Sequence, residues 1–312
     1  MAQAGGIVVV GSINADLTAR VARHPSPGET LIGSGGEITP GGKGANQALA
    51  AALQGAAVAF VGAVGDDPQA EAANALLREG GVDLSRVATV SGPTGLAIIT
   101  VDDAGENSII VVPGANADVD EALVDKHRAA IEEAAVVLLQ GEIPPAASAA
   151  AARAARGRVV LNLAPVVELD AETVRAADPL VVNEHEAALA AGILGGEAPE
   201  GEPEPEELAG RLVALGVASV VVTLGPRGAL VAEGDDLSHV ASPSVEVRDT
   251  TGAGDAFTGA LAARLEKGEG LLDAARHACR VGAFATTRPG AQPSYPGPGE
   301  ELPAVADTGP AA

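Results

Sequence analysis

The stretch IVVVG at residues 7–11 is the first of several short apolar runs that are bounded by glycine or asparagine. Runs of this length and composition are typical of strands buried within a parallel sheet. The others are VAFVGAV at 58–64, VVLLQG at 136–141, VVLNL at 159–163, LVVN at 180–183 and SVVVTLG at 219–225.

Alanine-rich segments with helical spacing alternate with these runs. Such alternation implies right-handed crossovers, helices on both faces of the sheet and ligands near the carboxyl ends of the strands. We therefore expect an α/β fold with a mostly parallel central sheet. The expected helices span residues 44–54, 69–80, 121–134, 146–156, 206–215, 254–267 and 271–286.

Two stretches interrupt this alternation. In residues 16–40 and 96–114, apolar and polar residues alternate around turn sequences such as PSPGE and DDAGE. They predict antiparallel hairpins that form a small β-lid over an active site; an extension of the sheet edge is the alternative. We expect residues 1–296 to form one domain, the Pro/Glu segment 195–208 to be a surface loop, and the tail 297–312 to be poorly ordered.

The composition excludes several classes of function. Only Phe60, Phe257, Phe284 and Tyr295 are aromatic, which excludes binding by stacking on rings. A net charge of −23 disfavours nucleic-acid and anionic-membrane partners. The single cysteine allows no internal disulfide, and no apolar run approaches the roughly 18 residues of a spanning helix. We expect a cytoplasmic protein.

The segment DTTGAGDAF at 249–257 precedes a helical pattern. Gly252 and Gly254 leave room for backbone amides to point at an anion at the helix N-terminus. Asp255 falls in the first turn of this helix, where its carboxylate could accept a proton from a hydroxyl that attacks a phosphoryl group. The alternative is that Asp255 only complements the helix dipole.

A second glycine-rich loop, PGGKGANQA at 40–48, also leads into a helix. It is not a P-loop, and the GSINAD sequence after the first strand lacks the dinucleotide-binding glycine pattern. What remains are Lys43, Asn46, Asn14 and Asp16, whose side chains can pair with neighbouring hydroxyls of a ligand. Each of them alone could equally be a turn or cap residue.

Together, these segments resemble the ribokinase/PfkB family of carbohydrate kinases. The resemblance covers about residues 6–295, in the family's order. The matching segments are GSINADL at 11–17, GGKGANQA at 41–48, GDD at 65–67, GEN at 105–107, PGAN at 113–116, NEHEA at 183–187, TLGPRG at 223–228, DTTGAGDAF at 249–257 and RPGAQPS at 288–294.

The resemblance implies ATP-dependent phosphorylation of D-ribose at O5, with a β-lid over the sugar. Asp255 would be the general base, and the amides of Gly252, Ala253 and Gly254 would stabilise the transferring group. Lys43 would add positive charge, bind the sugar or fix its loop. The implied sugar contacts are Asn14, Asp16, Gly42, Lys43, Asn46, Glu142 and Asp255.

The resemblance also implies sites for the nucleotide and for two cations. Glu186 would bind Mg²⁺ through water, or would only be an acid in a helix's first turn. Cys279 stands where a polar adenine contact is expected. The implied nucleotide contacts are Asn183, Thr223, Gly225, Pro226, Arg227, Gly228, Gly254 and Cys279. The implied K⁺ site comprises Asp249, Thr251, Ala285, Arg288, Gly290 and Ser294; a structural ion pair between Asp249 and Arg288 is the alternative reading of those two residues.

Two alternatives to ribose phosphorylation remain open at this point. The substrate could be another pentose, fructose or a nucleoside, or the protein could bind a sugar without turnover. The resemblance also implies a homodimer in which the lid edges of two chains pair.

Overall fold

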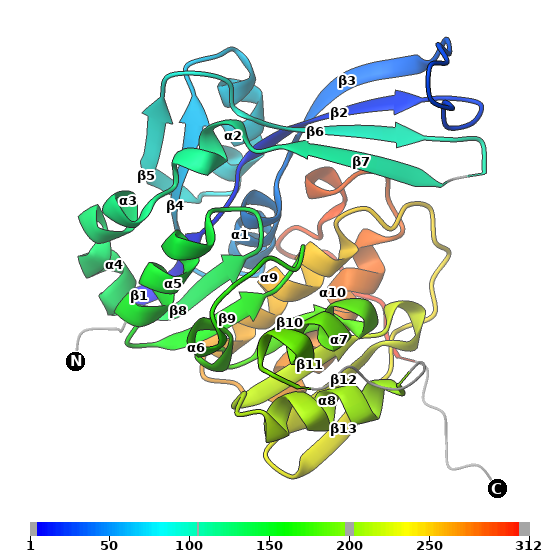
Figure 1. Ribbon diagram of the computed structural model, residues 1–312. Coiled ribbons are helices and arrows are strands. Elements are labelled where there is room, and N and C mark those ends of the chain that lie inside the picture. Colours follow the sequence, from blue (N-terminus) through cyan, green and yellow to red (C-terminus); the bar gives the residue numbers. More distant parts are fainter. Residues whose placement is uncertain (1–4, 105, 197–202, 306–312) are drawn as a thin grey trace, which may run out of the picture.

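The computed structural model describes residues 5–104, 106–196 and 203–305 (Figure 1). Within these residues, nine strands form the central sheet. Their order across the sheet is β13 (Asp236–Val240), β12 (Ala229–Glu233), β11 (Ser219–Thr223), β10 (Leu180–Asn183), β9 (Arg158–Asn162), β8 (Ala134–Gln140), β1 (Gly5–Val10), β4 (Val58–Gly65) and β5 (Asp83–Val90).

The sheet is parallel from β5 to β11, and β12 and β13 continue it antiparallel at one edge. This confirms the predicted fold class. The sequence did not predict β5, β12 or β13. Edge strand β5 has no fully buried residue, so it lacks the continuous apolar run by which the inner strands were recognised.

Helices cover both faces because successive side chains of a strand point in opposite directions. Ile7 and Val9 pack toward one layer of helices, and Val8 and Val10 toward the other. The first layer contains α1 (Lys43–Leu53), α2 (Gln69–Glu79), α9 (Ala253–Glu266) and α10 (Leu271–Ala285). The second contains α3 (Glu121–Lys126), α4 (Arg128–Glu133), α5 (Pro145–Ala154), α6 (Ala171–Arg175), α7 (Glu184–Ile193) and α8 (Pro205–Ala214).

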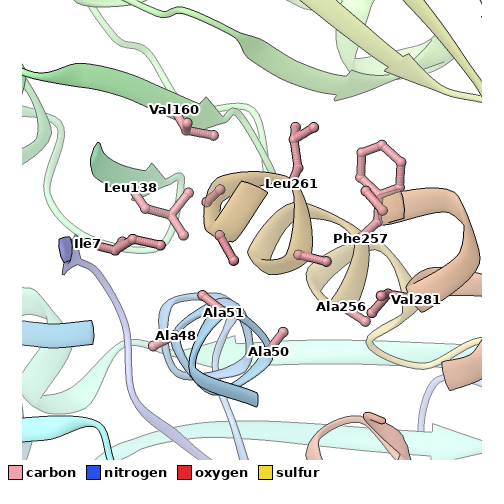
Figure 2. Packing of buried hydrophobic residues seen from close by; sticks show 14 of the residues in the cluster. Ile7, Ala48, Ala50, Ala51, Leu138, Val160, Ala256, Phe257, Leu261 and Val281 are labelled. Atoms are coloured by element: carbon pink, nitrogen blue, oxygen red, sulfur yellow. The ribbon is translucent and has the colours of Figure 1, made fainter. Parts of the chain in front are cut away.

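Small residues let α1 and α9 approach closely (Figure 2). A Cβ atom added to Gly259 would lie 2.6 Å from the Cβ of Ala50. Figure 2 shows Phe257 and Leu261 on the side of α9 that faces away from α1, where they join the core. The close packing brings the N-termini of α1 and α9 to the same end of the sheet.

The helix predictions were correct to within one or two residues except in three places. Segment 121–134 is two helices that meet at His127, and its last residue begins β8. Helix α6 was not predicted, and α7 was expected only in the alternative reading of Glu186 as an acid in a helix's first turn. In the described residues, no helix is both long and apolar enough to cross a membrane.

The two predicted hairpins form a separate four-stranded sheet, the lid. Its order is β3 (Ser34–Gly41), β2 (Asn14–Arg20), β6 (Gly95–Val101) and β7 (Asn107–Val112). Each hairpin is antiparallel, and β2 and β6 join the hairpins in parallel. The lid therefore is not an extension of the main sheet, and Figure 1 shows it projecting beyond the carboxyl end of that sheet.

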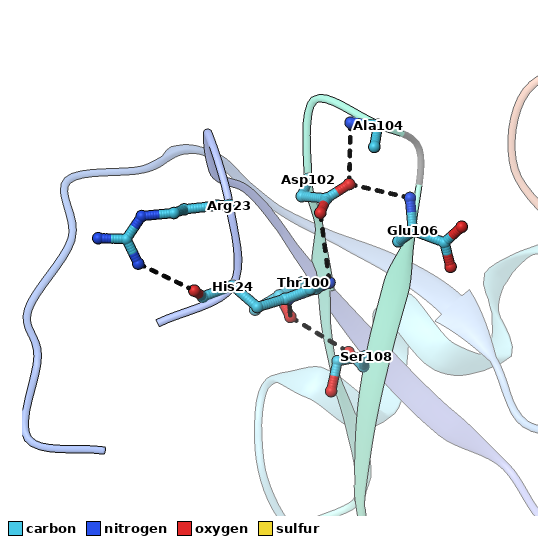
Figure 3. A network of polar contacts seen from close by, with 7 residues as sticks. All are labelled: Arg23, His24, Thr100, Asp102, Ala104, Glu106 and Ser108. Atoms are coloured by element: carbon cyan, nitrogen blue, oxygen red, sulfur yellow. Dashed lines mark hydrogen bonds and ion pairs between the residues drawn. The ribbon is translucent and has the colours of Figure 1, made fainter. Parts of the chain in front are cut away.

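Polar contacts tie the two hairpins together near their tips (Figure 3). One Asp102 oxygen accepts hydrogen bonds from the backbone N–H groups of Ala104 and Glu106, which closes the turn between β6 and β7. The Thr100 hydroxyl lies 3.2 Å from His24 Nδ1, on the segment that follows β2. The hairpins are thus linked at the tip as well as along β2 and β6.

Residues 297–305 of the expected tail lie against the domain. Arg280 on α10 donates hydrogen bonds to the carbonyl oxygens of Leu302 and Pro303, at 3.0 and 2.9 Å. Leu302 packs against the core. Packed structure therefore continues past residue 297, and residues 306–312 lie outside the described residues, as do residues 197–202 of the expected Pro/Glu loop.

Candidate active site

The predicted site residues gather at the carboxyl end of the main sheet. Asn14, Glu142, Asn183 and Thr223 lie at or just beyond the ends of β1, β8, β10 and β11. Asp255 comes from the first turn of α9, and a cavity of about 160 Å³ extends from it to Asn183 and Thr223. The sheet thus places the predicted sugar and nucleotide residues on two sides of one carboxylate.

The backbone before Asp255 requires glycine. Gly252, the N-cap of α9, has a φ of 72°. A Cβ atom there would lie 2.6 Å from the Ala291 Cβ and 2.7 Å from the Tyr295 hydroxyl, which donates a 3.1 Å hydrogen bond to the Gly252 carbonyl. Gly252 and Gly254 line the cavity. The Ala253 N–H instead donates to the Thr250 carbonyl at 3.2 Å, so the predicted third amide of the anion hole is engaged elsewhere.

Two side-chain amides hold the Asp255 carboxylate. Asn46 Nδ2 donates to Oδ2 at 2.9 Å, and Gln47 Nε2 donates to Oδ1 at 2.8 Å. Asn46 in turn accepts a 3.0 Å hydrogen bond from Gln292. Asp255 is only 7% exposed, so it is a buried carboxyl group with defined partners.

The residues predicted to contact the sugar are also connected by hydrogen bonds. Asn14 Oδ1 accepts from Asn116 Nδ2 at 2.7 Å. One Glu142 oxygen accepts from the Ser12 hydroxyl at 2.6 Å and from the Lys43 backbone N–H at 3.0 Å. Gly42, with a φ of 89°, is the N-cap of α1 and aligns this N–H. The loop 40–48 is therefore anchored to the strand ends through Glu142.

Asp16 has an unsatisfied buried oxygen. Its Oδ1 is buried and has no hydrogen-bond partner among the described residues. Burial, followed by the charges of Glu142 and Asp255, raises the pKa of Asp16 to about 7. The backbone of Gly41 packs so closely on this carboxylate that a Cβ atom there would overlap it. A ligand hydroxyl would supply the missing partner.

Lys43 is the cation of the cavity. Its side chain lines the cavity together with Asp255 and Glu186. The charge of Asp255 raises the pKa of Lys43 against the effect of burial, and Glu142 and Glu186 add to it. The ammonium group thus stays protonated where negative charge on a ligand would need compensation.

On the nucleotide side, Asn183 and Glu186 form a capping box at the start of α7. The Glu186 N–H donates to Asn183 Oδ1, and the Asn183 N–H to Glu186 Oε2, both at 2.8 Å. Burial raises the pKa of Glu186 despite the hydrogen bond from Asn183 and the charge of Lys43. The capping box alone accounts for an asparagine and a glutamate at these two positions. It uses only one carboxylate oxygen of Glu186.

The TLGPRG loop forms the 3₁₀ turn Gly225–Arg227 after β11, and Gly228 follows it. Arg227 pairs with Glu184 at 2.6 Å and Pro226 is exposed. Cys279 lies in the core on α10, where burial raises the pKa of its thiol to about 12. This neutral thiol offers a packing surface rather than a polar contact.

Asp249 bridges two loops beside the start of α9. Its oxygens accept from the backbone N–H groups of Thr251 at 2.9 Å and Gly290 at 2.7 Å. Arg288 pairs instead with Glu300 at 2.6 Å and stacks over Phe284, so the alternative of an Asp249–Arg288 ion pair is wrong. Of the other residues implied for K⁺, Ala285 and Ser294 are buried, and Ser294 donates to the Ala291 carbonyl at 2.7 Å.

Sequence reasoning missed the residues that support this site. They are amide, hydroxyl and aromatic side chains whose partners are far away in the sequence, so spacing gave no signal for them. The available hint was that Ser12, Gln47, Asn116 and Gln292 lie within segments that carry the family resemblance. The missed residues are Ser12, Gln47, Asn116, Gln140, Asn162, Gln292 and Tyr295.

A buried carboxylate beside a glycine-rich helix N-terminus and a lysine suits transfer of a phosphoryl group to a hydroxyl. The family model described as pfkB family carbohydrate kinase matches residues 5–297. The chain therefore belongs to the pfkB family of carbohydrate kinases, and it is an ATP-dependent carbohydrate kinase.

Its relatives include ribokinases from several kingdoms. The chain is 35% identical to the ribokinase of Haemophilus influenzae, over 93% of this chain and 95% of that protein. It is 36% identical to the ribokinase of Bacillus subtilis, over 93% and 96%. The structure of Arabidopsis thaliana ribokinase complexed with ribose and ATP superposes with a TM-score of 0.84 at 33% identity, over 94% of this chain and 96% of that one. These matches confirm the resemblance and the fold.

Proposed function

We propose that this chain transfers the γ-phosphoryl group of ATP to the O5 hydroxyl of D-ribose, with Asp255 as the general base. The observation that carries this assignment is the position of Asp255. Its buried carboxylate lies in one cavity with Lys43, Glu186 and the glycines that precede α9. Relatives named ribokinase, one of them solved with ribose and ATP, support ribose as the acceptor.

In the proposed reaction, Asp255 accepts the proton of the attacking hydroxyl. A bond forms between the sugar oxygen and the γ-phosphorus, and the bond from that phosphorus to the bridging oxygen of ADP breaks. The amides of Gly252 and Gly254 and the ammonium of Lys43 offset the charge on the transferring group. The Ala253 amide joins them only if its 3.2 Å hydrogen bond to Thr250 opens.

Ribose would lie between the lid strand β2 and the start of α1. The unpartnered Asp16 oxygen can accept from a sugar hydroxyl, and its neighbours Asn14 and Asn46 can do the same or donate. The remaining contacts in the proposed sugar site are Gly42, Lys43, Glu142 and Asp255.

ATP would lie across the ends of β10 and β11, with its phosphates directed into the cavity. Asn183 and Thr223 line that cavity. The turn Gly225–Arg227, Gly228, Gly254 and the region of Cys279 would surround the remainder of the nucleotide.

Two cations complete the proposal, and the oxygens present fit both. Glu186 keeps one oxygen outside its capping box and would hold Mg²⁺ through water, where the metal would neutralise phosphate charge. The carboxylate of Asp249 has lone pairs beyond its two backbone bonds, and Ser294 has a hydroxyl acceptor. With backbone oxygens of Thr251, Ala285, Arg288 and Gly290, they would hold K⁺ and so fix the loop before α9.

The lid also supports the proposed homodimer. The exposed apolar residues of edge strand β7 are Ile109, Ile110, Val111 and Val112, and Ile38 is exposed on the opposite edge strand β3. Pairing of lids between two chains would cover them. The need for ATP supports a cytoplasmic location.

The test is a substrate panel in an ADP-release assay. Purified protein is supplied with Mg-ATP and ribose, other pentoses, fructose or adenosine, and kcat/KM is compared. Ribose should be the best acceptor. A preference for fructose or adenosine would overturn the ribose assignment and leave the kinase assignment in place.

A further inference from the structure

A chain of buried side-chain amides leads from the main sheet to the general base. Gln140 and Asn162 end the neighbouring strands β8 and β9 and lie opposite each other in register. Gln47, on the first turns of α1, is fully buried between these strand ends and Asp255. Neither Gln47 nor Gln140 has a role in the function proposed above.

Every polar atom of the Gln47 amide has a defined partner. Its Nε2 donates to Asn162 Oδ1 and to Asp255 Oδ1, both at 2.8 Å, so two acceptors match its two hydrogens. Its Oε1 accepts from Gln140 Nε2 at 2.9 Å. A rotated Gln47 amide would set its oxygen against the oxygens of Asn162 and Asp255, and its nitrogen against that of Gln140.

The orientation of this chain is also fixed at its far end. Asn162 Nδ2 donates to the backbone carbonyl of Val181 at 3.0 Å. A carbonyl can only accept, so Asn162 must present its own oxygen to Gln47. The Gln47 amide therefore has one orientation: it accepts from Gln140 and donates both to Asn162 and to Asp255.

We infer that Gln47 is a positioning residue that holds the Asp255 carboxylate in one orientation for proton transfer. Gln47 fixes Oδ1 while Asn46 fixes Oδ2. Each carboxylate oxygen has about two lone pairs, so one remains on each oxygen for the sugar hydroxyl. Without Gln47, the carboxylate is held at one oxygen only and can rotate. The inference rests on the proposed role of Asp255.

The first experiment compares Gln47→Met with Gln54→Met. Both glutamines belong to α1 or its C-cap and both make side-chain hydrogen bonds, but Gln54 bonds to His277 and Pro296 at the far end of the helix. Gln47→Met should lower kcat about 100-fold, because misplacement of a catalytic group by about 1 Å has that effect. The KM values for ribose and ATP should stay within about threefold. Gln54→Met should leave kcat unchanged.

The second experiment is a double-mutant cycle with Asp255→Ala. If Gln47 acts through Asp255, Gln47→Met should change the residual rate of Asp255→Ala less than about twofold. The same 100-fold loss in both backgrounds would overturn the inference, as would an unchanged kcat in the single variant. If Gln47→Met does not fold, Gln140→Met replaces it in the cycle. Gln140→Met should lower kcat about tenfold, and this loss must disappear when Asp255 is already alanine. A wild-type protein inactive on ribose would instead refute the proposed function, and the cycle would then be run on the preferred sugar.

Discussion

The sugar side and the nucleotide side of the site are built differently. Asn14, Asn46 and Asp255 are 2%, 6% and 7% exposed, and each makes a side-chain hydrogen bond to a residue far away in the sequence. Asn183 and Arg227 are exposed, and their side chains bond to residues of the adjoining α7. An unpaired buried polar group costs about 1–3 kcal/mol, and an exposed ion pair contributes about 0–1 kcal/mol. Selectivity should therefore reside on the sugar side.

The largest effect is expected at the point where the two sides meet. Asp255→Asn should lower kcat by about 10³-fold or more, because the variant cannot accept the proton. Ribose binding should remain measurable by calorimetry, since Asn14, Asp16 and Glu142 are unchanged. A loss of less than about tenfold would refute the role of Asp255 as general base. It would also refute the assignment of Asp255 as the residue at which the sugar side and the nucleotide side meet.

Asp16 should make the stability of the sugar side depend on pH. Its folded pKa of about 7 lies above the ordinary aspartate value of 3.8, so the folded protein binds this proton more tightly than the unfolded chain. Stability in the absence of sugar should fall as pH rises from about 4 to about 7, by at most roughly 4 kcal/mol. Asp16→Asn lacks this titration.

Urea unfolding at pH 5 and pH 8 measures this effect. The stability of Asp16→Asn relative to wild type should be greater at pH 8 than at pH 5. An equal difference at the two pH values would show that Asp16 is not the titrating group. Glu37→Gln, at an exposed position of lid strand β3, is the matched control and should show no such pH dependence.

Two matched asparagine variants compare the sides directly. Asn14→Ala should raise the KM for ribose about 10- to 100-fold, in line with about 1–3 kcal/mol for a lost buried hydrogen bond, and leave the KM for ATP unchanged. Asn183→Ala should raise the KM for ATP less than about tenfold and lower stability by about 1 kcal/mol through loss of the α7 cap. If Asn14→Ala raised the KM for ribose no more than Asn183→Ala raised the KM for ATP, the proposed difference between the two sides would be wrong.

The smallest effect concerns the monovalent cation. At matched ionic strength, turnover should be a few-fold faster in K⁺ than in Na⁺, because the ion would organise the backbone before α9. Asp249→Asn should reduce that ratio. Equal rates in the two salts for the wild type would count against the cation site.

The sequence predicted the inner sheet and the lid because both depend on local patterns. IVVVG and the five similar apolar runs predict buried strands, and the alternation of apolar and polar residues in 16–40 predicts a hairpin. The parallel pairing of β2 with β6 was not predictable, since it joins residues about 80 apart in the chain. The antiparallel edge strands β12 and β13 lack the regular helix crossovers that revealed the others.

The residues alone predicted the site where glycine-rich loops mark it, and the family resemblance added residues such as Asp16 and Glu142. DTTGAGDAF and PGGKGANQA place Asp255 and Asn46 at helix N-termini, and the structure brings them within 2.9 Å. Gln140, Asn162 and Gln292 carry no such mark. A polar residue at the end of a strand has many ordinary explanations, and only its partners in space single it out. The supporting amides therefore required the folded structure.

Strand β2 has a mechanical consequence. It begins at Asn14, includes Asp16 and ends at Arg20, where it approaches the tip of the lid. The seven residues are paired with β3 on one side and β6 on the other, so the strand should move as one rigid unit. A tilt of the lid about a point below Asn14 would move both side chains of the proposed sugar site away from Asp255. Opening of the lid and release of the sugar would then be a single movement.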